Sequence, residues 1–196
     1  MGNMLEPNSP QDDARSSLNV AAFLARVGAC SVEPFLHKHF GANYFGLQAF
    51  AVLIVAPVFG ALCFPHHDQG PLMAFLGLYI LAVLCARSEA CRLRQKGVIL
   101  HTRFNGWPRG LAYSVSAGKE QRVKSIGEPL LVSVWGTLIY LSWNPPLGAW
   151  LIFAACSLGV TNGMYRIRTE RQVDNILDAQ IEQEMMADRL RDLRGR

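Results

Sequence analysis

Two short clusters of histidine come nearest to a chemical site in this chain. His66, His67 and Asp68 are consecutive, and His37 and His39 flank a lysine. Neutral imidazole and carboxylate groups bind transition metals, and histidine changes its charge between about pH 5 and pH 8. We therefore treat the first cluster as a weak candidate for a metal site, and either cluster as a candidate pH sensor. The simpler interpretation is that these histidines lie in solvated loops.

Other catalytic arrangements are missing from the sequence. It has no pair of cysteines at CxxC spacing, no Ser-His-Asp arrangement and no phosphate-binding loop. The five cysteines are expected to be free, small hydrophobic residues. His101 is the one remaining histidine, and no base or nucleophile in the sequence can be paired with it. The sequence therefore predicts no catalytic residue and no cofactor, and it favours a non-catalytic protein over an enzyme.

An Asn-Gly step lies between two apolar, β-prone stretches, VILHTRF and LAYSVS. Asn105 and Gly106 favour a two-residue hairpin turn, and the aromatic residues Phe104 and Trp107 flank it. A loop that only connects two helices has no need for two aromatic residues at its tip. We therefore expect these four residues to pack against a neighbour, which would be a partner, the N-terminal helix or the membrane surface. Pro108 opposes regular pairing of the return strand.

Four long apolar runs set the expected fold class. A bilayer core of about 30 Å needs roughly 20 apolar residues in a helix. The sequence predicts membrane spans at residues 44–64, 70–86, 128–143 and 146–165. The alternative is that these runs are core helices of a soluble protein. The second run reaches the lower limit of about 17 residues if it is counted whole. The third run is short unless Gly127 and Glu128 lie at the interface.

The basic residues test this arrangement independently. Lys and Arg number three in residues 1–43, nine in residues 87–127 and seven in residues 166–196, which accounts for all 19. The connections at 65–69 and 144–145 contain none. Basic residues mark the cytoplasmic side of a membrane protein. We therefore predict an all-α polytopic fold of two helical hairpins, with both termini and the central loop in the cytoplasm.

The central loop, residues 87–127, is strongly basic. Arg87, Arg92, Arg94 and Lys96 are expected to contact anionic lipid headgroups, each contributing about 1 kcal/mol. The alternative is a hairpin that binds nucleic acid through phosphate contacts and stacking. Because positive charge is expected in any cytoplasmic loop, it carries little information about nucleic acid, and we do not expect nucleic acid as a partner.

The N-terminal region divides into two parts. Residues 1–15 are polar and are expected to form a flexible tail. Residues 16–43 contain apolar residues at roughly helical spacing, which predicts a short amphipathic helix that ends before Pro34. This helix would lie on the membrane or against the central loop. An extra helix packed in the core is the equally supported alternative.

The C-terminal residues 166–196 are expected to continue the fourth span as a charged cytoplasmic helix. An alternating three- and four-residue spacing typical of a coiled coil runs through Ile176, Ala179, Gln183, Met186, Leu190 and Leu193. A second apolar row consists of Val173, Leu177, Ile181 and Met185. These rows favour a helix that packs on a partner over a helix surrounded by water.

These features lead to one functional hypothesis and two alternatives. The first is a non-catalytic membrane subunit or scaffold that assembles through its spans and C-terminal helix into a homo- or hetero-oligomer. Its partners would be lipids, other copies of itself, or other subunits. The second is a homo-oligomeric channel for ions or small solutes. Because the spans lack charged residues in mid-membrane, hydroxyl and backbone groups would line its pore. The third is a membrane enzyme of unknown reaction.

Overall fold

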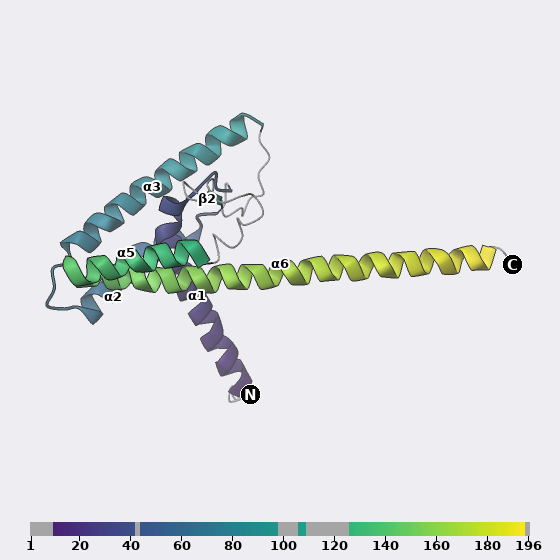
Figure 1. Ribbon diagram of the computed structural model, residues 1–196, viewed down its shortest axis with the longest axis horizontal. Coiled ribbons are helices and arrows are strands. Elements are labelled where there is room, and N and C mark those ends of the chain that lie inside the picture. The colour runs from purple at the N-terminus through teal and green to yellow at the C-terminus, as the bar shows by residue number, and fades with distance from the viewer. Residues whose placement is uncertain (1–9, 42–43, 98–105, 109–125, 195–196) are drawn as a thin grey trace, which may run out of the picture. The chain divides into compact units, whose positions relative to one another are not determined.

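The structure is a computed structural model that describes residues 10–41, 44–97, 106–108 and 126–194. It is mostly helical, which confirms the all-α class. The helices are α1 (Pro10–Leu36), α2 (Leu47–Cys63), α3 (Gly70–Gln95), α5 (Glu128–Ser142) and α6 (Pro145–Arg194), and two short strands are β1 (His37–Lys38) and β2 (Trp107–Pro108) (Figure 1). The chain divides into two compact units, Met1–Thr161 and Asn162–Arg196.

Proline and glycine residues mark the ends of these helices. Prolines stand in the first turns of α3 and α5 and begin α6, where the missing N–H removes no helical hydrogen bond. Asn144 caps α6, because its Oδ1 accepts a hydrogen bond of 3.0 Å from Leu147 N. Gly97 follows the end of α3 with φ of 75°, a left-handed conformation that glycine adopts without strain.

The first unit contains two helical hairpins. Gln69 closes the α2–α3 hairpin, because its amide donates hydrogen bonds to Phe64 O at 2.9 Å and to Gly60 O at 3.2 Å. In the α5–α6 hairpin, the lack of side chains at Gly136 and Gly148 lets the two helices approach closely. A Cβ added at Gly148 would collide with the backbone of Tyr140. Small residues on facing helices allow a contact as close as this one.

Helix α1 packs into both hairpins, which corrects one expectation. It continues through Pro34 to Leu36, and residues 27–34 are buried. Its small and apolar residues pack against α2 and α3 on one side, and against α6 and Val132 of α5 on the other. The backbone hydrogen bond lost at Pro34 is outweighed by this packing. The second half of α1 is therefore a core helix, as the alternative interpretation had it.

Two helices are long and apolar enough to cross a membrane, α3 and the apolar part of α6. Helices α2 and α5 are also apolar but shorter, with 17 and 15 residues. Most side chains of the apolar window in α3 face outward, since 22% of that window is buried. Outward-facing apolar side chains are typical of a membrane surface and unusual on the core helix of a soluble protein.

The two strands join the end of α1 to the central loop. They pair antiparallel, with His37 opposite Pro108 and Lys38 opposite Trp107. Gly106 is buried and has φ of 76°, and a Cβ there would lie 2.6 Å from the carbonyl oxygen of Lys38. The backbone at the expected hairpin tip therefore lies against the N-terminal segment. Phe104 and Asn105 lie outside the described residues, as do the stretches that would form the hairpin.

The close contact at Gly148 gives a direct test of the α5–α6 hairpin. We expect Gly148→Ala to lower the free energy of unfolding by about 1–3 kcal/mol, because the backbone of Tyr140 cannot move away cheaply. Gly159→Ala is the matched control in the same helix, because no described atom lies within 4 Å of its added Cβ. Reversible unfolding in mixed detergent, followed by circular dichroism, measures both. Equal stability of the two variants would contradict this packing.

Candidate functional site: a buried polar cluster around α1

Five polar side chains gather around the buried half of α1, and we call them the α1 cluster. They are Arg26, Cys30 and Glu33 of α1, Tyr44 of the following loop, and Tyr79 of α3. The side chain of Glu33 is completely buried. Its two oxygens accept hydrogen bonds from Arg26 Nη1 at 3.1 Å and from Tyr44 Oη at 2.7 Å. A buried carboxylate with two donors, one of them charged, is stably held in an apolar surrounding.

Arg26 completes the ion pair and stays charged. Its guanidinium carbon lies 4.9 Å from the centre of the Tyr44 ring, a favourable cation–π distance. Burial alone would lower the pKa of Arg26, but the negative charge of Glu33 more than compensates and raises it. The Tyr44 hydroxyl donates its hydrogen bond to the other oxygen of Glu33.

Cys30 lies one turn before Glu33 and faces α3. Its Sγ is 3.7 Å from Tyr79 Oη, which also donates a hydrogen bond of 3.4 Å to Ala49 O of α2. Burial, and then the negative charge of Glu33, raise the pKa of the Cys30 thiol to about 12. Since the thiolate is the reactive form, this thiol is chemically inert at neutral pH. The contact links α1 to both helices of the first hairpin.

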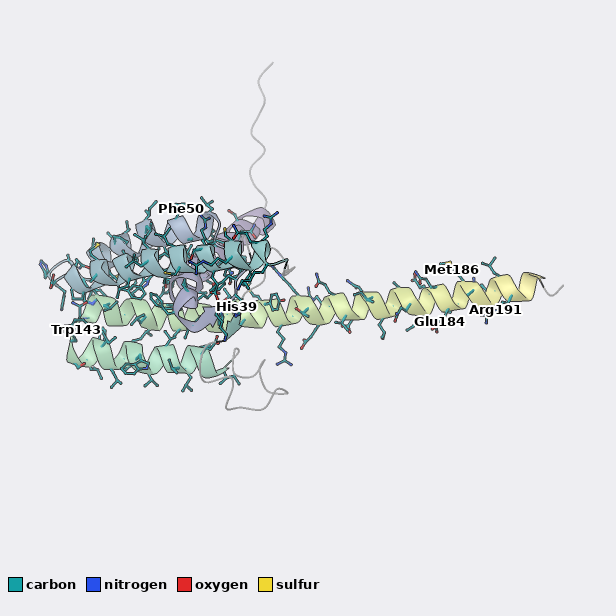
Figure 2. The ribbon with its side chains drawn as sticks, turned by 90° about the horizontal axis from the view of Figure 1, so that it is seen from above. His39, Phe50, Trp143, Glu184, Met186 and Arg191 are labelled. Atoms are coloured by element: carbon teal, nitrogen blue, oxygen red, sulfur yellow. The ribbon has the colours of Figure 1, made fainter. Side chains whose placement is uncertain are left out.

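The segment His37–His39 makes two further links. His37 is buried, and its Nε2 lies 3.0 and 2.9 Å from the two oxygens of Glu128 at the start of α5. His39 Nδ1 lies 3.0 Å from Glu89 Oε1 in the C-terminal part of α3. His39 (labelled in Figure 2) has φ of 59°, so the chain turns at this residue, after the contact of His37 with Glu128. Both histidines thus pair with carboxylates, one on each hairpin.

In the other histidine cluster, Asp68 has a structural role. Asp68 Oδ1 accepts a hydrogen bond of 2.8 Å from Gly70 N, which begins α3, and Asp68 O accepts one of 2.9 Å from Asn144. His66 and His67 are exposed. Within residues 10–41, 44–97, 106–108 and 126–194, no three His, Cys, Asp or Glu side chains lie close enough to hold a metal ion. The metal-site candidate therefore has no complete set of ligands there.

The basic candidates for lipid contact differ from one another. Arg87 Nη2 donates a hydrogen bond of 2.9 Å to Phe45 O, so this arginine helps to hold the loop before α2. Arg92, Arg94 and Lys96 are exposed at the end of α3, where their charges favour the helix C-terminus. Their expected contact with lipid headgroups stays a prediction.

The α1 cluster was missed in the sequence because α1 was expected at the surface. Arg26 and Glu33 are seven residues apart, which places them on one face of a helix two turns apart. Opposite charges at that spacing in an otherwise apolar helix are the signal that could have identified them.

One hollow between α1, α3, α5 and α6 is lined by aliphatic and aromatic side chains alone. The α1 cluster, in contrast, consists of polar side chains that bind one another, which suits it to holding helices together.

Comparison with protein families, with characterised proteins and with solved structures finds no match to this chain.

The ion pair of the α1 cluster predicts a large effect of a small change. Glu33→Gln keeps the shape but leaves the partly buried Arg26 without its counter-charge, which should cost about 2–4 kcal/mol of unfolding free energy. Glu170→Gln is the control, because its pair with Arg166 is exposed and should add nothing measurable. Unfolding in mixed detergent compares the two. A Glu33→Gln protein as stable as the control would show that the pair contributes little.

The raised pKa of Cys30 predicts its chemical behaviour. With a pKa of about 12, about one thiol in a thousand is ionised at pH 9, so an alkylating reagent should leave Cys30 unmodified from pH 7 to pH 9. Exposed Cys91 in the same molecule is the internal control and should react. Mass spectrometry of the digested protein reads both sites. Cys30 should react once the protein is unfolded, and modification of the folded protein at pH 8 would contradict its burial.

Proposed function

We propose that this chain is a multi-pass membrane protein with a non-catalytic, assembling role. Helices α2, α3 and α5 and the first part of α6 would cross the membrane as two hairpins, with both termini in the cytoplasm. The cytoplasmic part of α6 would bind a second copy of the chain. The observation that carries the proposal is a charged helix with exposed apolar rows, attached to helices whose outer surfaces are apolar.

The outer surface of the first unit supports the membrane part of the proposal. Large apolar side chains on α2 face away from the other helices, as Phe50 shows in Figure 2. They follow one another at three- or four-residue spacing: Leu47, Phe50, Ile54, Val58 and Leu62. Helices α3 and α5 carry similar exposed apolar residues. Water would be an unfavourable surrounding for this surface, whereas lipid acyl chains are a favourable one.

Helix lengths are compatible with four spans. At about 1.5 Å per residue, α3 is about 39 Å long, α2 about 26 Å and α5 about 23 Å. A hydrocarbon core is about 30 Å thick, and short spans are accommodated by local thinning of the bilayer. The basic residues at the end of α3 and after residue 165 then lie on one side. This is the side that the distribution of Lys and Arg assigns to the cytoplasm.

The second unit supports the assembly part of the proposal. Its apolar residues are largely exposed along a helix rich in charge, including Ile176, Met186 and Leu190. Figure 2 shows Met186 on the opposite side of this helix from Glu184 and Arg191. The side chain of Leu193 lies outside the described residues. A row of this kind stabilises a helix only when a partner covers it.

Two physical arguments favour a second copy as the partner. Copies inserted in one membrane with the same topology present their cytoplasmic helices in parallel, so equivalent residues meet at the same level. Gln183 would then face Gln183 of the other copy, and a glutamine amide both donates and accepts hydrogen bonds. A polar pair at one core position fixes register and number of strands in coiled coils.

The ionisable side chains inside the first unit support a structural role over transport. Arg26 pairs with Glu33, and His37 lies within hydrogen-bonding distance of Glu128. These groups join helices to one another. A proton or ion pathway needs groups that can exchange their partners with water or substrate, so this pairing favours the scaffold hypothesis.

The proposal predicts which part of the chain sets the size of the assembly. Deleting residues 172–196 should leave membrane insertion intact and reduce the purified protein to a monomer. Ile176→Ala with Leu190→Ala should weaken the association at least tenfold, because both residues lose most of their apolar contact area. The control variant, Asp174→Ala with Asp178→Ala, changes two residues outside the row that contains Ile176 and Leu190. It should not weaken the association. Native mass spectrometry and light scattering in detergent measure the size.

Each result of this experiment has one meaning. A complex of unchanged mass after the deletion would overturn assembly through α6. A complex of this chain with a different protein, lost in the deletion, would replace the second copy by another subunit. Protein that no longer fractionates with membranes would overturn the membrane part.

A further inference from the structure

We infer that residues 16–25, the exposed half of α1, lie in the plane of the membrane within its cytoplasmic leaflet and bind lipid acyl chains. We call these residues the α1 arm. The inference rests on the proposed membrane arrangement and adds an interaction surface to it. It commits the arm to lipid as its occupant, in place of water or a second protein.

The composition of the arm is the first argument. Its sequence, SSLNVAAFLA, has no charged residue, although charged residues stand directly before and after it. Leu18, Val20, Phe23 and Leu24 are exposed, with Leu18 at 70%. A helix exposed to water normally carries charge on its outer face, whereas this one is apolar or weakly polar around its circumference. Such a surface is suited to hydrocarbon and to the boundary with the headgroups.

The depth of the buried half of α1 is the second argument. Gly28, which follows the arm closely, lies against Phe153 and Ser157 of α6. Ser157 is eight residues before Tyr165, or about 12 Å along the helix. In the proposed topology Tyr165 marks the cytoplasmic interface, since tyrosine settles at the level of the headgroups. The arm therefore leaves the bundle from a point inside the cytoplasmic leaflet.

The direction of α1 is the third argument. Figure 1 shows that α1 crosses α5 and the adjoining first part of α6 at a steep angle. If α5 and α6 cross the bilayer, α1 runs closer to the membrane plane than to the membrane normal. Arg26 cannot follow the arm into lipid, because it is bound to Glu33 inside the bundle. A helix that emerges sideways at this depth meets acyl chains along its length.

Spin labels test the arm against matched positions. The background protein has Cys63, Cys85, Cys91 and Cys156 replaced by alanine and keeps the buried Cys30, and this parent should take up no label. Cysteine is then introduced singly at Leu18, at Ile54 of α2 as the lipid reference, and at Asp178 of α6 as the water reference. Leu18 and Ile54 have nearly equal exposure, 70% and 67%. The protein is placed in liposomes, and two collision rates of each spin label are compared. One is the rate with oxygen, which concentrates in lipid, and the other is the rate with a water-soluble nickel complex.

We expect the oxygen-to-nickel ratio at Leu18 to be several-fold higher than at Asp178 and close to the ratio at Ile54. A ratio at Leu18 as low as that at Asp178, with Ile54 still in lipid, would place the arm in water and overturn the inference alone. Low collision with both reagents at Leu18 would show that protein covers the arm, which overturns it as well. A water-like ratio at Ile54 would instead overturn the proposed membrane arrangement.

Discussion

The burial of the Glu33 carboxylate is the constraint on which the rest of the first unit depends. A carboxylate removed from water loses several kcal/mol of solvation unless charged and hydrogen-bonding partners replace it. The partners are Arg26 and Tyr44, at 3.1 and 2.7 Å. Both must be in place at once, because one donor alone leaves half of the carboxylate unsatisfied. This requirement fixes the second half of α1 and the loop before α2 in one arrangement.

The two hairpins are then held through α1. The first hairpin contacts it at Tyr79, and the second at Gly28 and through the pair of His37 with Glu128. In the proposed membrane arrangement, the helices gain little from apolar contact alone, because lipid offers the same contact. Polar pairs and close approach at small residues therefore provide the specificity of the arrangement, and α1 supplies both. Apolar packing around it fills the remaining space.

The sequence predicted the helical class, the apolar helices and the continuous C-terminal helix, because each rests on local composition and periodicity. At Gly106, where the sequence predicts a turn, the structure has positive φ, and the rest of that turn stays a prediction. The position of α1 could not be read locally, since an amphipathic helix suits a membrane surface and a protein core alike. The deciding contacts come from residues far along the chain, such as Glu128, 91 positions after His37. Pairings of that separation leave no pattern in a single sequence.

This separation also orders the assembly of the protein. In the proposed membrane arrangement, α1 is synthesised before any of the helices that cross the bilayer. Tyr79 and Glu128, which bind its buried half and the adjoining strand, follow much later in the chain. Until both hairpins are inserted, Glu33 and Arg26 have no enclosed site, and water or the headgroup layer is their favourable surrounding. An uncharged arm would keep the waiting helix at the membrane during this interval and reduce its search for the bundle to two dimensions. The apolar surface that we infer to contact lipid in the finished protein would therefore also guide α1 to its position between the hairpins.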